Sequence, residues 1–419
     1  MYSYKNKFLH CESINIKDLH KEFGSPFYCY SSNILEEKYT ELKKALKNNN
    51  SLICFSLKSN SNQSIIKTFS SMGSGADVVS IGELKRAIKA GIPTNKIVFS
   101  GVGKTSEEII FAIKNNILMI NVESISELNQ ISSLASSSNL IAPIALRINP
   151  DIKAGGNEKI STGKKQDKFG IPVNEAIDIY TYANNLDGIK IKGIDVHIGS
   201  QINDLAPFEK TFDSILSAIN ILEEKNISID IIDIGGGIGI NYKDEKPLNI
   251  NDYSKLISNK FGFLNKKIIL EPGRYLTAES GVLITKIIYI KENQSKKFLI
   301  VDAAMNDFIR PSLYGSIHNA IPIVENAKSK ATENYDIVGP VCETGDFFIK
   351  DFPSPELREG DFIAITNVGA YGSVLASNYN SRPSITEIIV RQDKYSVIRE
   401  KQNIDDFINL DNLATWQKS

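Results

Sequence analysis

The sequence predicts an α/β protein in which a (β/α)8 barrel is followed by a β domain. Eight short apolar runs alternate with helical patterns, and the pattern changes after Arg274. Runs rich in Val and Ile are typical of parallel strands buried on both faces. Eight of them indicate a closed barrel, whose active site lies at the carboxyl ends of its strands. The runs are SLICFS (51–56), ADVVS (76–80), KIVFSG (96–101), LMINVES (118–124), PIALRINP (143–150), GIDVHIGS (193–200), IDIIDIGGG (229–237) and KIILEPGR (267–274).

Three connecting segments carry a helix-start signal. Ser80, Thr105 and Ser124 are each followed three residues later by Glu, which is the spacing of a capping box. After Ser80, apolar residues recur on one helical face until Gly91, a residue typical of a helix end. These segments predict amphipathic helices between the strands.

The chain after Arg274 has strand-like runs joined by turns, with few helical stretches, and this predicts an antiparallel β domain. The N-terminal run FYCYSS (27–32) is also strand-like, and we expect it to join that domain. We therefore expect a barrel over residues 33–278 and a β domain made of residues 1–32 and 279–419. The C-terminal runs are KKFLIVDAAM (296–305), YDIVGPVC (335–342), DFIAITNVGAY (361–371) and ITEIIVRQDKYSVIRE (385–400).

Length and composition narrow the class of protein. A chain of 419 residues is too long for one ordinary core. A net charge of −1 without basic clusters gives no support to nucleic-acid binding, and no apolar stretch is long enough to cross a membrane. The four cysteines lack Cys-x-x-Cys spacing, so we expect neither a metal site nor disulfides. The chain start lacks a signal-peptide pattern, and we expect a reducing, cytoplasmic location.

The first polar residue at a strand end is Lys58, which opens onto the turn-prone stretch 59–62. A lysine at a barrel mouth can bond covalently to a carbonyl compound. The alternative is a surface lysine that happens to end a strand.

The glycines Gly235, Gly236 and Gly237 follow another apolar run, where their N–H groups can approach an anion. A dinucleotide fingerprint would require glycine in place of Ile240, so the pattern favours a phosphate monoester. A tight turn without a ligand is the alternative.

Three further residues end barrel runs. His197 interrupts an apolar run, and the alternative to a ligand-binding role is an ordinary core histidine. Glu271 could hold a heteroaromatic nitrogen protonated, and Arg274 could clamp a carboxylate, unless the two form a structural ion pair. A lysine, backbone amides, an imidazole and a carboxylate together are the supports that pyridoxal phosphate (PLP) requires.

These motifs resemble the alanine-racemase-fold (fold-type III) PLP decarboxylases, and within that group the diaminopimelate decarboxylase family. The resemblance covers nearly the whole chain, with the motifs in order. They are FSLKSNSN (55–62), GADVVSIGEL (75–84), the segment 145–171 with its TG-x4-KFG pattern, HIGSQ (197–201), DIGGGIGINY (233–242), EPGR (271–274), GPVCETGD (339–346), NVGAYG (367–372) and NYNSRP (378–383).

The resemblance implies a role for each matching position. Lys58 matches the lysine that binds PLP covalently, and Cys342 matches the proton donor. His197 resembles the ring-stacking residue, and Glu271 the partner of the pyridine nitrogen. The other cofactor-binding positions are Asp77, Ser200, Gly236, Gly237, Pro272, Gly273, Arg274 and Tyr371. The substrate-binding positions are Arg274, Arg310 and Tyr314 for a distal carboxylate, Glu343 for a distal ammonium group, and Tyr371.

The implied reaction is PLP-dependent decarboxylation of meso-2,6-diaminopimelate to L-lysine and CO2, the last step of lysine biosynthesis. The resemblance also implies a homodimer in which Cys342 and Glu343 reach the partner's barrel. Two features depart from the family pattern: FSLKSN replaces an alanine-rich lysine motif, and Asn157 stands where His is frequent.

Three alternatives to this function stay open. The first is a related decarboxylase of arginine, ornithine or carboxynorspermidine, although a diamine without a distal carboxylate would leave Arg274 and Arg310 unpaired. The second is a racemase, against which the CETGD and NYNSRP motifs argue. The third is a PLP-binding or partner-binding protein without catalysis, against which the presence of both Lys58 and Cys342 argues.

Overall fold

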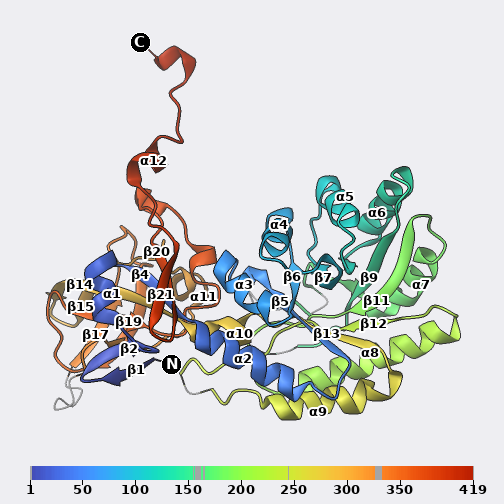
Figure 1. Cartoon of the computed structure of the whole chain (residues 1–419), viewed down its shortest axis with the longest axis horizontal. Coiled ribbons are helices and arrows are strands. Elements are labelled where there is room, and N and C mark those ends of the chain that lie inside the picture. Colours follow the sequence, from blue (N-terminus) through green and yellow to red (C-terminus); the bar gives the residue numbers. More distant parts are fainter. Residues whose placement is uncertain are drawn as a thin grey trace. The chain divides into compact units, whose positions relative to one another are not determined.

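A computed structural model describes residues 2–153, 155, 162–163, 166–243, 245–325 and 333–418. The chain divides into two compact units (Figure 1). One is Leu35–Thr277, and the other combines Met1–Ile34 with Ala278–Ser419. Asn157 lies outside the described residues.

The unit Leu35–Thr277 is a closed barrel, as the sequence predicts. Among the described residues, eight parallel strands follow one another around it, with β8 paired to β9 and β13 paired back to β5. Each strand falls within or overlaps one of the eight apolar runs, and the short β10 (Ile171–Pro172) adds to β9 from outside the ring. The strands are β5 (Ser51–Ser56), β6 (Gly75–Val78), β7 (Ile97–Phe99), β8 (Met119–Val122), β9 (Ala142–Asn149), β11 (Ile189–Asp195), β12 (Ile231–Asp233) and β13 (Lys267–Leu270).

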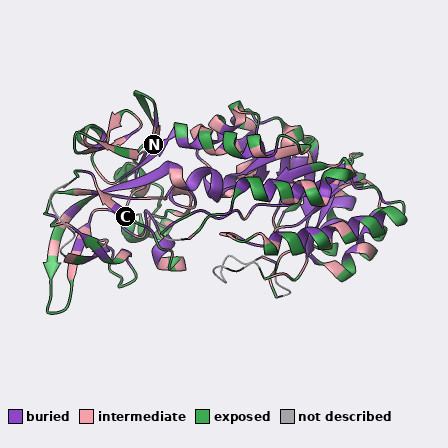
Figure 2. Ribbon diagram, turned by 90° about the horizontal axis from the view of Figure 1, so that it is seen from below, coloured by how far each residue is buried: buried purple, intermediate pink, exposed green. Residues whose placement is uncertain are grey.

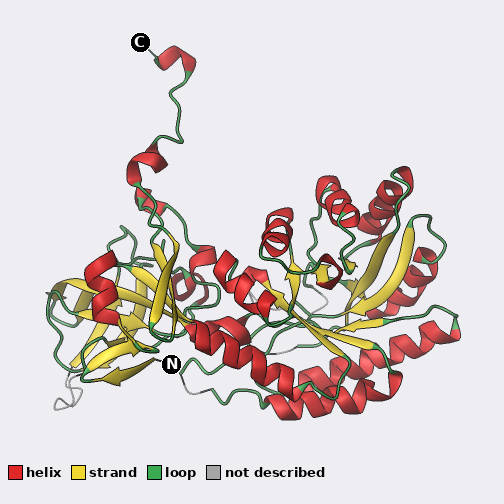
Figure 3. Cartoon of the chain, in the orientation of Figure 1, coloured by secondary structure: helices red, strands yellow, loops and turns green. Residues whose placement is uncertain are grey.

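Helices connect the strands and enclose them (Figure 3). Their inner faces are buried and their outer faces are exposed (Figure 2), which is the pattern of amphipathic helices on a barrel. They are α2 (Ser32–Ala45), α3 (Gln63–Ser71), α4 (Ile81–Lys89), α5 (Ser106–Lys114), α6 (Ile125–Ser137), α7 (Val173–Ala183), α8 (Ala206–Glu224), α9 (Ile250–Phe261) and α10 (Arg274–Thr277).

Side chains from six strands fill one level of the barrel with apolar groups. They form one buried cluster consisting of Cys54, Val98, Met119, Ala145, Ile231 and Ile269. The polar residues that follow the strands therefore stand on a packed apolar floor, which holds the strand ends at fixed positions.

The three expected helix starts are confirmed. The side chains of Ser80, Thr105 and Ser124 each accept the N–H of the Glu three residues later. Only Thr105 closes the full reciprocal box, in which Glu108 accepts the Thr105 N–H. In the other two turns, Glu83 and Glu127 accept the N–H of the residue before the cap, which directly follows a strand. Gly91, with φ of +85°, follows the end of α4.

The second unit is rich in strands. Its large sheet runs in the order β18-β17-β15-β14-β4-β20-β21, and β19 pairs with β14 and β16. The N-terminal strand β4 (Phe27–Ser31) lies in this sheet between β14 and β20. The other members are β14 (Gly281–Glu292), β15 (Lys297–Val301), β16 (Ala320–Pro322), β17 (Glu333–Val338), β18 (Phe347–Ser354), β19 (Phe362–Ile365), β20 (Thr386–Arg391) and β21 (Lys394–Arg399).

This sheet differs from the sequence expectation in two respects. The long strands β14 and β18 lie outside the four strand-like runs identified above. In addition, β15 pairs with β17 in parallel, and β20 pairs with β4 in parallel. Both parallel pairs join strands that are not sequence neighbours, and such pairing is set by tertiary packing that a single run of residues does not encode.

Smaller elements complete this unit. An N-terminal three-stranded sheet consists of β1 (Tyr2–Lys5), β2 (Phe8–Cys11) and β3 (Ile14–Asn15), followed by α1 (Ile16–Phe23). The short helices α11 (Arg310–Tyr314) and α12 (Ile404–Ile408) lie in the C-terminal part. No helix among the described residues is long and apolar enough to cross a membrane.

Candidate active site

Lys58 stands at the carboxyl end of β5, in a single 3-10 turn (Leu57–Ser59). Its Nζ lies 2.8 Å from Oδ2 of Asp77, which is fully buried near the end of β6. Ser56 also donates to this carboxylate oxygen, at 2.7 Å. The amine is therefore aimed at the barrel mouth beside a fixed negative charge, although a third of its side chain is exposed.

His197 follows the end of β11 by two residues and is half-buried. Its Nδ1 accepts the N–H of Gly236 at 3.1 Å, so the ring carries its proton on Nε2. Burial, followed by the positive charges of Lys58 and Arg147, holds the pKa of His197 well below its usual value. The imidazole is thus neutral at pH 7 and fixed in orientation, which suits a ring that packs against a flat ligand.

The glycine turn after β12 is packed too closely for any other residue. A Cβ on Gly236 would lie 2.2 Å from the Glu271 carbonyl oxygen, and one on Gly237, where φ is +100°, would lie 2.7 Å from the Gly199 carbonyl oxygen. The Gly235 N–H already donates to Asp233 and the Gly236 N–H to His197. The expectation that all three amides face an anion is therefore too broad, because the first two are used to hold the turn together.

Glu271 directly follows β13 and lies in a cluster of buried carboxyl groups. The carboxyl oxygens of Asp195, Asp233 and Glu271 lie within 4.8 Å of one another. Burial, and then the charges of Asp233, Asp77 and Asp195, raise the pKa of Glu271 well above its usual value. Burial likewise raises the pKa of Asp233 to about 7. Burial and the neighbouring negative charges therefore favour the protonated form of Glu271.

Arg274 begins α10 and is almost fully buried. Its guanidinium donates to Ser200 Oγ at 3.0 Å and to the Tyr242 hydroxyl at 2.7 Å. The preceding Pro272 accepts the Ser56 N–H, and a Cβ on Gly273 would lie 2.9 Å from Ser59 Cβ. Close backbone packing thus places Ser200 and Arg274 beside the glycine turn.

Arg310, Tyr314 and Tyr371 come together in the strand-rich unit. The Arg310 guanidinium lies 5.9 Å from the Tyr314 ring centre and 5.8 Å from that of Tyr371. It also donates to Ser316 and to His318 Nε2. Tyr371 has φ of +55°, an uncommon conformation for a bulky residue, and such conformations concentrate at functional sites.

Cys342 and Glu343 are exposed on a loop after β17. The buried Asp346 holds this loop, since its carboxylate accepts the N–H groups of Val341 and Met305, each at 2.7 Å. Asn380 accepts the Cys342 N–H, and the Tyr379 hydroxyl donates to Glu343. The thiol and the carboxylate are therefore presented on an ordered loop of this unit.

Sequence reasoning missed several polar residues at the barrel end. Glu83, identified only as a helix-capping residue, lies where burial raises its pKa to about 7, while Lys58 lowers it. Arg147 is buried on β9 and donates to Glu123 at 2.9 Å. Asp195 and Asp233 are the last residues of β11 and β12 and lie inside apolar runs, and a charged residue inside a buried run was the signal that could have identified them.

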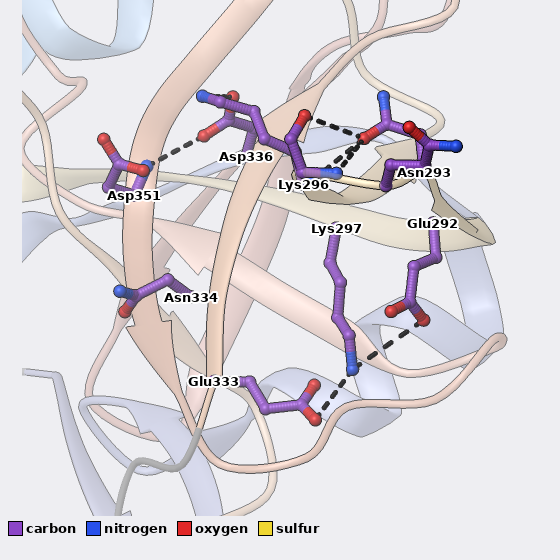
Figure 4. Close-up of a pocket in the computed structure, with 10 residues that line it drawn as sticks. Glu292, Asn293, Lys296, Lys297, Glu333, Asn334, Asp336 and Asp351 are labelled. Atoms are coloured by element: carbon purple, nitrogen blue, oxygen red, sulfur yellow. Dashed lines mark hydrogen bonds and ion pairs between the residues drawn. The ribbon is translucent and has the colours of Figure 1, made fainter.

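A hollow of about 440 Å³ lies on the strand-rich unit, around the turn between β14 and β15 (Figure 4). Both of its lysines form ion pairs: Lys296 with Asp336 and Lys297 with Glu333, each with an N–O distance of 2.7 Å, and Lys297 also with Glu292 at 3.8 Å. None of the predicted site residues lines it. Because its lysines are engaged by neighbouring carboxylates, this hollow is not the candidate site.

The barrel residues fit the cofactor that the sequence predicts. A lysine amine points into the mouth, an imidazole is fixed beside the glycine turn, and the carboxyl of Glu271, whose pKa burial raises, lies in a buried cluster. Buried carboxylate oxygens of Asp77 and Asp233 have no hydrogen-bond partner among the described residues, as expected at a site built for a polar ligand. The fold and these residues define a barrel enzyme of the PLP-binding class.

Comparison with known proteins agrees. Residues 32–278 match the family model described as "Pyridoxal-dependent decarboxylase, pyridoxal binding domain". A diaminopimelate decarboxylase of Zymomonas mobilis is 42% identical over 420 residues, covering 99% of each chain. The chain therefore belongs to the pyridoxal-dependent decarboxylases and, among them, to the diaminopimelate decarboxylase family.

Solved structures show the same relationship. Diaminopimelate decarboxylase from Helicobacter pylori complexed with L-lysine has a TM-score of 0.91 at 44% identity, covering 94% of this chain and 99% of that one. The enzyme from M. jannaschii in co-complex with L-lysine has a TM-score of 0.94 at 34% identity, covering 99% of this chain and 98% of that one. The predicted barrel and its second, strand-rich domain are thus confirmed.

The carboxyl cluster leads to a prediction about the cofactor-free protein. The folded-state pKa of Asp233, about 7, lies above the ordinary aspartate value of 3.8. Between these values the folded state binds more protons than the unfolded one, so this residue's contribution to stability falls as pH rises from 4 to 7. Asp233→Asn removes that contribution, which is a slope in the free energy of unfolding of up to about 1.4 kcal/mol per pH unit. Urea unfolding at pH 5, 6 and 7 should show a flatter profile for the variant.

The matched control is Asp230→Asn, just before the same strand, where the side chain is 57% exposed. Its pH profile should follow that of the unmodified protein. Parallel profiles for Asp233→Asn and the unmodified protein would show that Asp233 titrates in its ordinary range.

Proposed function

We propose that this chain decarboxylates meso-2,6-diaminopimelate to L-lysine and CO2, using PLP. The observation that carries the proposal is a lysine amine beside Asp77 and the buried carboxyl of Glu271 at the carboxyl end of one barrel, in a chain whose full-length relatives are named diaminopimelate decarboxylases. As in those relatives, we assign this reaction to the formation of lysine.

The direct test is to measure CO2 release and lysine formation from meso-2,6-diaminopimelate by the purified PLP-loaded protein. Arginine, ornithine and carboxynorspermidine complete the panel, together with a racemase assay that follows the optical rotation of L-arginine and L-ornithine. Faster CO2 release from one of these three would favour the related decarboxylase, and loss of optical rotation without CO2 would favour a racemase. A protein that neither releases CO2 from any of them nor racemises them would be a binding protein.

The barrel residues divide the work of holding the cofactor. PLP, when bound, accepts the electron pair that departing CO2 leaves behind. Glu271 would share its proton with the pyridine nitrogen, which the raised pKa of its carboxyl supports. His197 would pack against the ring as a neutral imidazole. Ser200, the Gly237 amide and the start of α10 would bind the phosphate.

Lys58 would bind the cofactor covalently and yield its place to the α-amine of the substrate. Asp77, 2.8 Å from the Lys58 Nζ, would take up the positive charge of the released amine and keep it close to the reacting carbon. Ser56 fixes that carboxylate from the other side of the strand end. This arrangement orients the lysine for both binding and release.

The strand-rich unit would supply the remaining groups. The Cys342 thiol would return a proton to Cα after CO2 leaves, since a thiol pKa lies close enough to neutrality for proton transfer. Arg310, with Tyr314 and Tyr371 around it, would bind the distal carboxylate. Glu343 would bind the distal ammonium group. Arg274 already contacts Ser200 and Tyr242, which supports a role at the phosphate as well as at the substrate.

We further propose a homodimer in which Cys342 and Glu343 complete the site of the partner subunit. Both residues are exposed on an ordered loop of the unit that contains no part of the barrel. In a shared site, the subunit that donates the catalytic thiol and the substrate-binding carboxylate must expose both groups on its surface.

We also place the protein in a reducing, cytoplasmic compartment. The buried thiols of Cys11 and Cys29 are close enough to hydrogen-bond, yet both are free. Adjacent free thiols are typical of reducing conditions. Cell fractionation checks this, and recovery of the protein in an oxidising compartment would contradict it.

Substrate specificity gives a second prediction. Arg310→Met should lower kcat/KM for diaminopimelate, because it removes the cation that pairs with a desolvated carboxylate. The decrease should correspond to a loss of transition-state stabilisation of about 2–5 kcal/mol. Most of the loss should appear in KM. Inhibition by the product L-lysine, which keeps the distal carboxylate, should weaken by a similar factor. Inhibition by 1,5-diaminopentane, which lacks that carboxylate, should change less, so the two inhibition constants report the contact.

Arg358→Met is the control, because the Arg358 side chain is 79% exposed in the same unit. It should leave kcat/KM for diaminopimelate and both inhibition constants unchanged. Equal weakening of both inhibitors in Arg310→Met would instead assign Arg310 to folding or to the reacting end of the substrate.

A further inference from the structure

The C-terminal segment, residues 403–418, carries a row of exposed apolar side chains. They are Ile404, Ile408, Leu410, Leu413 and Trp416, with exposed fractions of 49%, 56%, 72%, 64% and 86%. Trp416 is the single tryptophan of the chain. Isolated exposed apolar residues are ordinary, but a contiguous group of large ones marks an interaction surface.

This segment, which we call the C-terminal arm, is ordered without being packed on its own unit. Asn403 caps α12 by accepting the Asp405 N–H at 2.8 Å, and Gln417 closes a second turn with Ala414. In the described part of the chain, the hydrogen bonds of the arm join residues of the arm to one another. Figure 1 shows the arm leaving the sheet after β21 and extending away from it.

The root of the arm is fixed beside the loop that carries Cys342 and Glu343. The Gln402 N–H donates to Ser384, and its side-chain oxygen accepts the amide of Asn378 at 2.9 Å. The residues after Asn378 contact that loop, since Tyr379 donates to Glu343 and Asn380 accepts the Cys342 N–H. The arm therefore leaves this unit at the edge that the shared site would present to a partner subunit.

The arm is not an addition peculiar to this chain. The Zymomonas relative and the M. jannaschii structure each align with 99% of this chain, which includes most of residues 403–418. A second copy of the chain is an occupant that is present wherever the chain itself is present.

We propose that the C-terminal arm docks on the second subunit of a homodimer, with its apolar row covered by the partner. The exposed area of the five side chains is on the order of 700 Å², close to the ~800 Å² that one partner contributes to a standard interface. Two-fold symmetry doubles this contribution, since each subunit gives and receives an arm. The location of the interface rests on the shared site proposed above, whereas the exposed apolar row is independent of it.

Trp416 reports directly on docking because its fluorescence is the only tryptophan signal. In the PLP-loaded enzyme at micromolar concentration, Trp416 emission should be shifted to the blue and protected from acrylamide. Dilution through the dimer dissociation range, followed by sedimentation velocity, should return it to the emission of exposed tryptophan. Exposed emission in the dimer would overturn the proposal. Blue-shifted emission that persists in the monomer would also overturn it, since the arm would then cover its own chain.

Two variants test the energetic contribution of the arm. Trp416→Gln and a chain that ends at Gln402, which keeps the contacts at the root, should each raise the dimer dissociation constant by about 30-fold or more, as loss of an interface tryptophan does. Phe263→Gln is the control, because Phe263 is 70% exposed but adjoins the amino end of β13, opposite the candidate site. It should leave the dissociation constant unchanged.

Failure of this proposal is distinguishable from failure of the shared site. A shortened chain with unaltered dimer affinity overturns the role of the arm, whereas the shared site is judged by complementation between inactive subunits. If the arm variants dissociate as expected, their activity should recover at protein concentrations high enough to restore the dimer. Activity that remains low in the restored dimer would mean that the arm acts within the site, against the docking role proposed here.

Discussion

Lys58→Ala is expected to abolish turnover, with kcat lowered by at least roughly 10³-fold. The amine of Lys58 is the group that reaches the barrel mouth from β5. The methyl side chain of alanine cannot bond to the cofactor and therefore cannot transfer it to the substrate. The loss should appear in CO2 release from diaminopimelate under saturating PLP, while the folded state, followed by circular dichroism, is retained.

Lys58→Arg separates charge from nucleophilicity. It keeps a cation beside Asp77, but a guanidinium does not form the covalent link. This variant should be as inactive as Lys58→Ala. Borohydride reduction of the unmodified PLP-loaded protein should fix the cofactor to the peptide that contains Lys58, as read by mass spectrometry. An adduct on another lysine, or an active Lys58→Arg protein, would reject the assignment.

Mixing inactive Lys58→Ala protein with inactive Cys342→Ala protein is expected to restore activity. In a mixed dimer with shared sites, one site receives both substitutions and the other receives neither. With random exchange, half of the dimers are mixed, so about a quarter of the wild-type number of sites should reappear. CO2 release is measured after subunit exchange has been verified with differently tagged subunits.

A same-side pair provides the control for this experiment. Lys58→Ala mixed with Glu271→Ala places one substitution in each site of every mixed dimer, so no activity should return. Recovery in the first mixture alone assigns Cys342 to the partner's site. Absence of recovery in both mixtures, with exchange verified, would mean that each site is built within one chain.

The fold was predictable because its strongest signals are local. A parallel strand covered on both faces must be apolar along its length, and each of the eight apolar runs corresponds to a barrel strand. The caps at Ser80, Thr105 and Ser124 depend only on residues three positions away. The strands β14 and β18 were not recognised. The first five residues of β14 are all buried and the buried positions of β18 are irregularly spaced, because the neighbours that cover each strand are set by the folded sheet.

The roles assigned to the site residues stay predictions. The structure adds further polar residues at the barrel end that sequence spacing does not reveal. Glu83, Arg147, Asp195 and Asp233 were absent from the predicted site, because capping patterns and apolar runs explain those segments without them. Their surroundings alter their chemistry: burial raises the pKa of Glu83 and of Asp233 to about 7. Such shifts depend on neighbours brought together by barrel closure.

The sequence by itself determined the barrel, the number of its strands and the polar residues that follow them, because apolar periodicity and capping act over a few residues. Only the tertiary structure decided which of those polar groups meet. Gly236 donates to His197, which is 39 residues away, and Ser56 donates to the Glu271 carbonyl oxygen, which is 215 residues away. Contacts of this kind form only when the ring of strands closes, and closure decides which amides remain for a phosphate and which carboxyl groups retain a proton.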